Sequence, residues 1–386
     1  MDKSANICRI YDSFEVGNIH LDSKFPEYYI QTEVIPIKYN PVKINRIELP
    51  PSVFVDVPKF DQLELDKDRL GKFGRLTIEA RQVTNPFEGI GLSIFGNRAA
   101  VKLANCDAMN DLTGSKFTLE NKTSSKKLTY CDIASGPGSF TQYLQYRFPN
   151  SEGYGITLRD TKLDWDPRII NFSNFTAFYG SDNSGDLYKH WKSFVDFVRE
   201  KHPEGVDVVV GDGGFDTTDR YEAQEFLSSR LLLTQVLVGI NATKIGGNFL
   251  VKAFNVVTKL SGQLLFILSQ SFEKVVPFKP VSSRPGNGEV YVICLNLKRN
   301  PHYELLSAAA NDYTDDVYLE SLFNEELPVD FVEWLTNLNN NRIERQSGII
   351  NNTIRHLEGV QVPKEVYNIS KFLKIWALPP GLPGKR

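Results

Sequence analysis

Residues 131–140 read CDIASGPGSF, and this stretch decides the fold. The residues before the turn, KLTYCDIA (127–134), form a short run rich in apolar, β-branched and aromatic side chains, which is typical of a buried parallel strand. The residues after it, FTQYLQYRF (140–148), have a helical pattern. Glycine has no Cβ, so a glycine-rich turn can bend tightly and let a ligand approach the backbone. This order predicts an α/β sheet with the turn at the carboxyl end of a strand, where such sheets bind ligands.

The turn has a second interpretation, in which it only begins a helix and binds nothing. Its spacing, Gly136-x-Gly138, is not the GxGxxG of dinucleotide-binding proteins, and the chain has no GK[ST] for a nucleotide phosphate. A dinucleotide-dependent dehydrogenase is therefore disfavoured. The turn alone leaves the ligand-binding and the purely structural interpretations open.

Three further apolar runs predict strands, and each has a charged residue near one end. They are GVDVVVGDGGFD (205–216), IGGNFLVKAF (245–254) and NGEVYVICLNL (287–297). Asp212 is flanked by glycines, Lys252 lies in an apolar context, and Glu289 stands at a strand start. A lysine in an apolar strand is costly unless its ammonium finds a partner or extends past the sheet edge to water. Lys102 lies in a helical stretch, NRAAVKLANCD (97–107), before the first turn.

The bulk composition excludes several classes of protein. The chain has 386 residues, 41% hydrophobic and 24% charged, as expected for one large domain with additions or for two domains. We find no run of 18 apolar residues and no secretory signal, so neither a membrane span nor a leader is expected. The four cysteines include no CxxC pair and the five histidines are dispersed, so no metal site is expected and a reducing compartment fits. The net charge of −3 does not indicate a nucleic-acid binder, although a local basic groove can coexist with it.

The pattern along the chain predicts four parts. Residues 1–80 are broken by prolines, Pro58 among them, and predict an N-terminal extension of short strands and irregular chain. Residues 81–300 alternate apolar runs with helical stretches, as in an α/β domain. Residues 301–378 predict a helical extension, and residues 379–386 a flexible tail.

Blocks of the sequence, in their order, resemble those of the cap-specific mRNA ribose 2′-O-methyltransferases, within the FtsJ-type superfamily of S-adenosylmethionine (SAM) enzymes. The blocks are NRAAVKLAN, DIASGPGSFTQYL, GYGITLR, GDGGFD, GGNFLVKAF and KPVSSRPGNGEVYVIC. ARQVTNPFE (80–88) and LKIWALPP (373–380) are similar to segments of the cellular enzymes that modify the first transcribed nucleotide. The resemblance implies a Rossmann-like SAM-dependent methyltransferase sheet with helices on both faces.

The resemblance also implies a Lys-Asp-Lys-Glu tetrad. It falls on Lys102, Asp212, Lys252 and Glu289. Methyl transfer from a sulfonium to a hydroxyl is an in-line displacement, which needs alignment of the reacting atoms and removal of the hydroxyl proton. Lys252 is the expected base and must act as a neutral amine, which the positive charge of Lys102 and partial desolvation would favour. Asp212 and Glu289 oppose this effect, because carboxylates stabilise an ammonium, and the sequence does not say which effect is larger. The two carboxylates are expected to orient the two lysines.

For the cofactor, the resemblance implies that the first turn binds SAM, which leaves the protein as S-adenosylhomocysteine. The expected cofactor-binding residues are Asn97, Ala134, Ser135, Gly136, Pro137, Gly138, Ser139, Phe140 and Asp186. Asp186 is expected near the adenine, although an exposed loop aspartate is usually only solvated. The block GYGITLRD does not single out a partner for the ribose.

For RNA, the resemblance points to positions near Glu289 and on two other segments. The expected residues are Arg81, Glu222, Ala223, Gln224, Ser283, Arg284 and Asn287. Arg284 at a strand entrance suits a phosphate contact, whereas Arg81 can equally form a surface ion pair. The run LDKDRLGKFGR (65–75) is basic with an interleaved aromatic residue, which suits either a cap and stacked base or an ordinary solvated helix face.

The function implied is transfer of a methyl group from SAM to the ribose 2′-hydroxyl of a 5′-terminal nucleotide of capped mRNA, which is expected to be the first transcribed nucleotide. The N-terminal extension, residues 1–80, is expected to contact the cap or RNA. Expected partners are the capped 5′ end and other capping enzymes or RNA polymerase. The expected location is the nucleus, or the cytoplasm for a viral enzyme. A ribosomal or transfer RNA ribose methyltransferase and a non-catalytic RNA-binding subunit are the alternatives, and the four tetrad residue types argue against the second. The sequence does not say which 5′ nucleotide is modified or whether a 7-methylguanine is required.

Overall fold

The computed structural model describes residues 28–29, 33–44, 49–85, 88, 94–215, 223–362 and 369–379. Within this part of the chain, eight strands form one sheet and two more form a small ladder. The sheet strands are β1 (Tyr28–Tyr29), β3 (Thr129–Ile133), β4 (Glu152–Ile156), β5 (Phe175–Phe178), β6 (Val206–Gly211), β7 (Thr243–Phe254), β8 (Phe272–Phe278) and β9 (Glu289–Leu297). The ladder pairs β2 (Val42–Ile44) with β10 (Tyr318–Ser321).

The sheet order is β1-β8-β9-β7-β6-β3-β4-β5. Strands β3 to β7 pair in parallel, and β9 runs antiparallel to both β7 and β8. The amino end of β9 therefore lies at the same sheet edge as the carboxyl ends of β6 and β7. Phe254 at the end of β7 is in register with Glu289 at the start of β9. This topology confirms the predicted Rossmann-like sheet and brings the ends of distant segments together.

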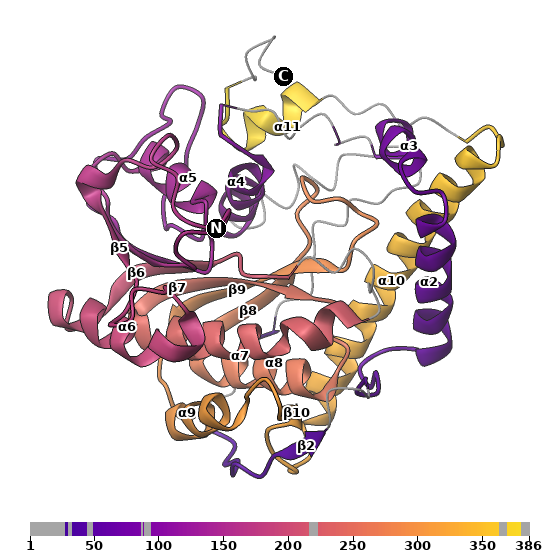
Figure 1. The fold of residues 1–386 in the computed structure, drawn as a ribbon. Helices are drawn as coiled ribbons and strands as arrows, with labels where there is room; N and C mark the ends of the chain where they lie inside the picture. Colours follow the sequence, from indigo (N-terminus) through magenta and orange to yellow (C-terminus); the bar gives the residue numbers. More distant parts are fainter. Residues whose placement is uncertain are drawn as a thin grey trace, which may run out of the picture.

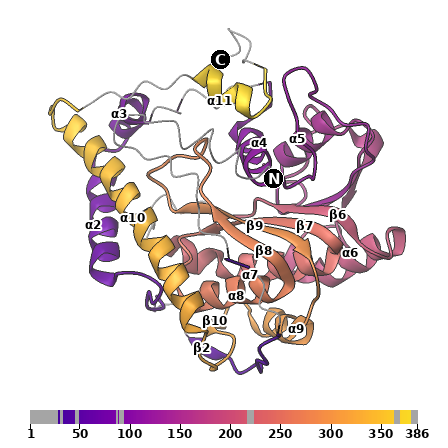
Figure 2. The same ribbon diagram turned by 180° about the vertical axis from the view of Figure 1, so that it is seen from behind.

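Helices cover both faces of the sheet (Figure 1; Figure 2). One face carries α4 (Arg98–Asn110), α5 (Ser139–Arg147) and α11 (Ile369–Ile375), and the other carries α6 (Leu187–Lys201), α7 (Gln224–Ala242) and α8 (Lys259–Ser271). A 3-10 turn, η2 (Phe172–Asn174), precedes β5. The apolar runs that predicted strands are buried on both faces: Cys131 and Val209 on one face and Tyr130 and Val208 on the other are at most 1% exposed.

The N-terminal extension is more helical than its sequence predicts. Two helices, α2 (Val57–Gly71) and α3 (Leu76–Thr84), replace the expected strands and irregular chain over residues 57–84. The expectation was wrong here because Pro58 is in the first turn of α2, where proline needs no amide partner, and Asp56 caps that helix by accepting from the Lys59 amide at 3.2 Å. The boundary expected at residue 80 lies inside α3.

The C-terminal extension is largely helical, as predicted. It contains α9 (Tyr303–Asp312), the ladder strand β10 and the long helix α10 (Val329–Leu357). Phe331, Leu335 and Leu338, whose spacing predicted α10, are at most 2% exposed. The expected tail falls mostly on residues 380–386, which lie outside the described residues.

The two extensions pack on each other. Helix α10 lies beside α2 and α3 along one side of the sheet (Figure 1; Figure 2). Phe60 and Leu63 of α2 share an apolar cluster with Ile343 and Ile350 of α10 and with Val257 after β7. The N-terminal extension therefore has a core that it shares with the C-terminal one. Within the described ranges, no helix is long and apolar enough to cross a membrane.

Candidate active site

The four tetrad residues form two lysine–carboxylate pairs at one edge of the sheet. Lys102 on α4 donates to Glu289 at 2.8 Å. Lys252 on β7 lies 3.1 Å from the Asp212 carboxylate and donates to the Asp212 carbonyl oxygen at 2.6 Å. All four side chains are largely buried, with exposed fractions of 8–18%. The predicted meeting of these residues is thus present in the structure.

The position of each pair follows from where its strands and its helix begin and end. Asp212 comes directly after β6, and Glu289 is the first residue of the antiparallel strand β9, so both carboxylates lie at the same edge. Asn97 caps α4 by accepting from the Ala99 amide at 2.8 Å, which fixes the start of the helix that carries Lys102. The expected cofactor role of Asn97 therefore has a structural alternative.

Three cations surround Glu289. Burial by itself raises the pKa of a carboxyl, but Lys102, Lys279 and Lys252 outweigh it and lower the pKa of Glu289 to about 2. Ser283 also donates to Glu289, at 2.7 Å. Glu289 is therefore a carboxylate at neutral pH and the negative centre of a cluster of lysines.

Lys279, which sequence reasoning missed, ties the loop before β9 to the strand. Its ammonium donates to the backbone oxygens of Asn287 at 2.9 Å and Glu289 at 2.7 Å, and to the Asn287 side chain. Burial lowers the pKa of Lys279 to about 7. The three acceptor oxygens that Lys279 contacts require all three hydrogens of its protonated ammonium. The sequence did contain a signal for Lys279: like Lys252 in LVK, it follows apolar residues in PFK, where a lysine needs a partner.

Two further residues hold Asp212 and its turn in place. Tyr291 donates to the Asp212 carboxylate at 2.9 Å, and it lies two residues after Glu289, so the alternation of a strand puts both side chains on one face. Gln235 accepts from the Gly213 amide at 3.1 Å. A glutamine inside the apolar run LLLTQVLVGI was the signal for this contact.

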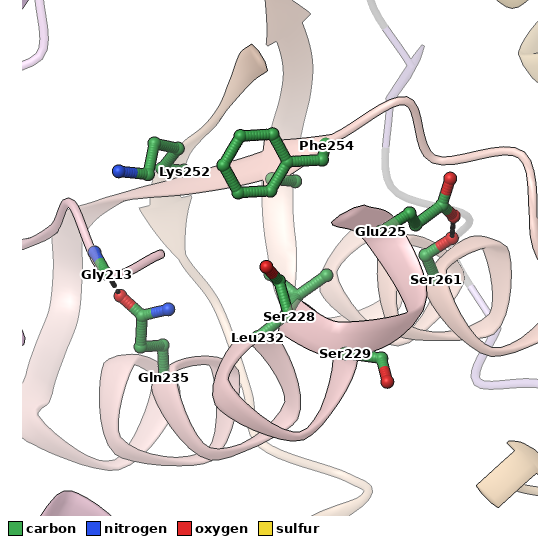
Figure 3. A pocket seen from close by; sticks show the side chains of 10 residues that line it. Gly213, Glu225, Ser228, Ser229, Leu232, Gln235, Lys252, Phe254 and Ser261 are labelled. Carbon is green, nitrogen blue, oxygen red and sulfur yellow. Dashed lines mark hydrogen bonds between the residues drawn. The ribbon is translucent and has the colours of Figure 1, made fainter. Parts of the chain in front are cut away.

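A small pocket lies beside Lys252 on the side of α7 and α8 (Figure 3). Gly213, Ser228, Gln235 and Phe254 are among its lining residues. Ser228 Oγ is buried with no hydrogen-bond partner among the described residues. A Cβ on Gly214 would lie 2.9 Å from Lys252 Cε, so the absence of a side chain there leaves room for the lysine.

The glycines of the first turn are required by the chain itself. A Cβ on Gly136 would lie 1.5 Å from the Leu163 carbonyl oxygen, and one on Gly138 would lie 2.1 Å from Ile170 Cδ1. The sequence-based reason for these glycines, close approach of a ligand, is therefore corrected: the segment that contains Leu163 and Ile170 occupies the space. Gly138 also has a φ of 107°, which side chains disfavour.

The same turn still offers contacts for an anionic group. Gly138, the N-cap of α5, has no side chain, but the buried carboxylate of Asp132 accepts from the Thr141 amide in the first turn at 3.0 Å. Ser139 Oγ is buried without a partner in the described chain. The other amide hydrogens of a helix N-terminus, at the positive end of its dipole, can bind an anion. Ser135 Oγ accepts from the Asp212 amide at 2.9 Å, so the turn is joined directly to the tetrad. Ala134 adopts a φ of 52°, and Phe140 is buried.

Asp186, expected near the adenine, is the N-cap of α6. Its carboxylate accepts from the Tyr188 amide at 2.9 Å, and it is 25% exposed. Its other oxygen lies 3.9 Å from Lys189 Nζ, and the partial exposure leaves part of the carboxylate accessible. Among the residues described, no group of three or more histidine, cysteine or acidic residues could hold a metal ion.

The expected RNA-contacting residues separate into buried and accessible ones. Ser283 is 1% exposed and Ala223 is fully buried, so neither side chain is at the surface. Arg284 is 49% exposed and pairs with Glu88 at 3.0 Å. Asn287 is held by Lys279. The others are Arg81 in α3, partly exposed, Gln224 at the start of α7, and Glu222, which lies outside the described residues.

The basic run over residues 65–75 is partly taken up by internal pairs. Lys67 is 10% exposed and bonded to Glu64 at 2.6 Å, and Arg69 pairs with Glu358. Lys72 and Arg75 are exposed. The run therefore offers fewer free cations than its sequence suggests.

The sheet order and the lysine–carboxylate pairs at its edge define the class of protein, an α/β methyltransferase. Residues 95–297 match the family model of the FtsJ-like methyltransferases, and the chain belongs to this family. FtsJ-like methyltransferases are SAM-dependent in general.

Curated relatives agree with this family. The cap-specific mRNA (nucleoside-2′-O-)-methyltransferase 1 of Xenopus laevis is 36% identical over 256 residues, which cover 62% of this chain and 29% of that protein. The proteins of the same name from Mus musculus (36%; 57% and 28% covered) and Drosophila melanogaster (35%; 56% and 28% covered) are similar. The matched part of the chain spans less than a third of the length of these relatives.

Proposed function

We propose that the chain is a SAM-dependent methyltransferase that modifies the ribose 2′-hydroxyl of the first transcribed nucleotide of capped mRNA. The observation that carries this proposal is the arrangement of Lys102–Glu289 and Lys252–Asp212 at one edge of the sheet. The relatives named as cap-specific mRNA (nucleoside-2′-O-)-methyltransferases support the choice of capped mRNA as substrate.

The turn of residues 134–140 is the proposed site for the methionine part of SAM. The unpartnered Ser139 hydroxyl and the first-turn amides of α5 that Asp132 does not bind suit its carboxylate. The accessible side of the Asp186 carboxylate is the proposed contact for the adenosine part. When bound, SAM supplies a methyl group on a positively charged sulfur.

The chain's own residues align the hydroxyl and take its proton. Lys252 Nζ is held by Asp212 at the end of β7, and it is the proposed acceptor of the 2′-hydroxyl proton as the oxygen gains the methyl carbon. Lys102 and Glu289 fix the opposite side of the site, and Glu289 keeps Lys102 in place.

RNA would approach over the loop before β9 and the N-terminal helices. Arg284 is half exposed next to this loop, and exchange of its Glu88 partner for a phosphate would leave a charge-assisted contact. Lys72 and Arg75 are exposed at the end of α2 and beyond it. A capped RNA as substrate implies a nuclear location and contact with other capping enzymes or RNA polymerase.

A methyl-transfer assay tests the proposal. The chain would be incubated with labelled SAM and with capped mRNA, uncapped mRNA, or structured ribosomal RNA fragments. We expect label in the capped RNA at a rate well above that in the other two. Preferred labelling of ribosomal RNA would contradict the substrate, and absence of label with all three, with SAM bound, would indicate a non-catalytic RNA-binding subunit.

A further inference from the structure

The turn that follows the catalytic strand β7 has an unusual backbone. Asn255 and Val256 have φ values of 51° and 65°. A positive φ is rare for a β-branched residue and persists only where the surrounding structure imposes it. Phe254, directly before the turn, is in register with Glu289. The turn therefore lies between the strand end that carries Lys252 and the strand start that carries Glu289.

Two elements of the methyltransferase domain hold this turn. Glu225 at the start of α7 is buried and accepts from the amides of Val257 at 3.0 Å and Thr258 at 2.9 Å, and it also binds the side chain of Ser261 (Figure 3). The Asn255 amide donates to the Gly288 carbonyl oxygen at 2.9 Å. These bonds satisfy the amides of the turn and leave two of its carbonyl oxygens to be paired.

Those two carbonyl oxygens are bound by α10. Asn339, fully buried, donates to the Val256 oxygen at 2.9 Å. Arg342 donates to the Asn255 oxygen. Burial lowers the pKa of Arg342 to about 10, so its guanidinium stays charged at neutral pH. Hydrogen bonds of buried groups are expensive to lose, because the partner left behind keeps its desolvation cost.

The same face of α10 also reaches the loop before β9. Gln346, 6% exposed, donates to the Gly286 carbonyl oxygen at 2.9 Å. Gly286 lies three residues before Glu289. Asn339, Arg342 and Gln346 are spaced by three and four residues, which places them on one face of the helix. One helix thus binds both loops that border the tetrad.

We propose that Asn339, Arg342 and Gln346 are positioning residues for methyl transfer, which act by fixing the turn after β7 and the loop before β9. The role in transfer rests on the proposed function. Helix α10 lies outside residues 95–297, which match the family model, so this support comes from the C-terminal extension. These three residues touch neither Lys252 nor Glu289 themselves; they hold the backbone on which these side chains stand.

Variants of α10 test this role. Gln346→Ala removes one bond to a loop, and Arg342→Lys keeps the charge but removes the guanidinium. Asn352→Ala, at an exposed position of the same helix, is the matched control. We expect kcat to fall about tenfold to a hundredfold in the first two, as for a small misplacement of reacting groups, with SAM affinity unchanged. The control should keep the wild-type kcat.

Hydrogen exchange separates this inference from the proposed function, because it needs no substrate. Backbone amides of residues 255–258 and 284–289 should exchange faster in Gln346→Ala and Arg342→Lys than in the wild type and the control. Unchanged exchange and unchanged kcat would overturn the positioning role. Loss of SAM affinity together with faster exchange throughout the sheet would also overturn it, because the residues would then support only general stability. A wild-type protein without methyl-transfer activity would contradict the proposed function. The exchange rates would still show whether Arg342 and Gln346 hold the two loops.

Discussion

The side chain of Lys252 makes two contacts with one residue, the carbonyl oxygen and the carboxylate of Asp212. The amine also lies 5.8 Å from the Phe254 ring centroid and the side chain is only 13% exposed, so the melting temperature of each variant separates a loss of chemistry from a loss of packing. We predict that Lys252→Ala lowers kcat by at least about 10²–10⁴-fold, the usual contribution of a positioned proton acceptor, with SAM affinity retained. Lys252→Arg should be nearly as inactive, because a guanidinium does not lose its proton at working pH. Lys244→Arg, in the same strand but paired with Asp207, is the control and should stay active.

Glu289 gives a prediction on acid stability. Its pKa is lowered from 4.5 to about 2, because the surrounding lysines outweigh the opposing effect of burial. A carboxylate with a lowered pKa in the folded state stabilises the fold above its unfolded pKa, and this stabilisation is lost as the pH falls through the folded value. The wild type should therefore exceed Glu289→Gln in free energy of unfolding at pH 7, and the difference should shrink between about pH 4.5 and about pH 2. A difference that is constant over this range would show that Glu289 is not held by the lysines.

At the scale of elements, the turn between β3 and α5 is fixed by the segment packed on it. A Cβ on Gly136 would collide with the Leu163 backbone, so Gly136→Ala should lower the free energy of unfolding by about 1–3 kcal/mol or more, as overpacking does. Gly348→Ala is the matched control: this helical position in α10 has nothing within 4 Å of the added carbon, and alanine should stabilise it by up to about 1 kcal/mol. Denaturant unfolding measures both. Equal stability of Gly136→Ala and the wild type would contradict the packing at this turn.

Strands and helices differ in how well the sequence predicts them. β3, β6, β7 and β9 were predictable because their apolar runs are buried on both faces and end in glycine or charge. α2 was not, because Pro58 looks like a strand breaker until its place in the first turn of a helix is known. The tetrad residues could be named from their sequence contexts. Tyr291 and Lys279 could not, because their roles depend on side-chain directions and loop closure that only the folded sheet determines.

At the scale of the whole molecule, the sheet and helix α4 supply the tetrad, and the two extensions support it. α2 and α10 share an apolar cluster with Val257, and α10 binds the loops on both sides of the site. The sequence showed the extensions but not this relation, since the contact of Phe54 with Asn339 joins residues 285 positions apart. A catalytic unit cut down to residues 95–297 should therefore lose methyl transfer.

Two matched RNAs would show whether the tetrad directs a methyl group to a ribose 2′-hydroxyl at the capped 5′ end. Both would carry a cap and the same sequence, and one would have a first transcribed nucleotide that lacks its 2′-hydroxyl. After incubation with SAM, digestion and mass spectrometry would locate the added methyl group. We predict one methyl on the ribose of the first nucleotide in the complete RNA, none in the deoxy RNA, and none with Lys252→Arg. A methyl group on a base, or equal methylation of the deoxy RNA, would contradict the account.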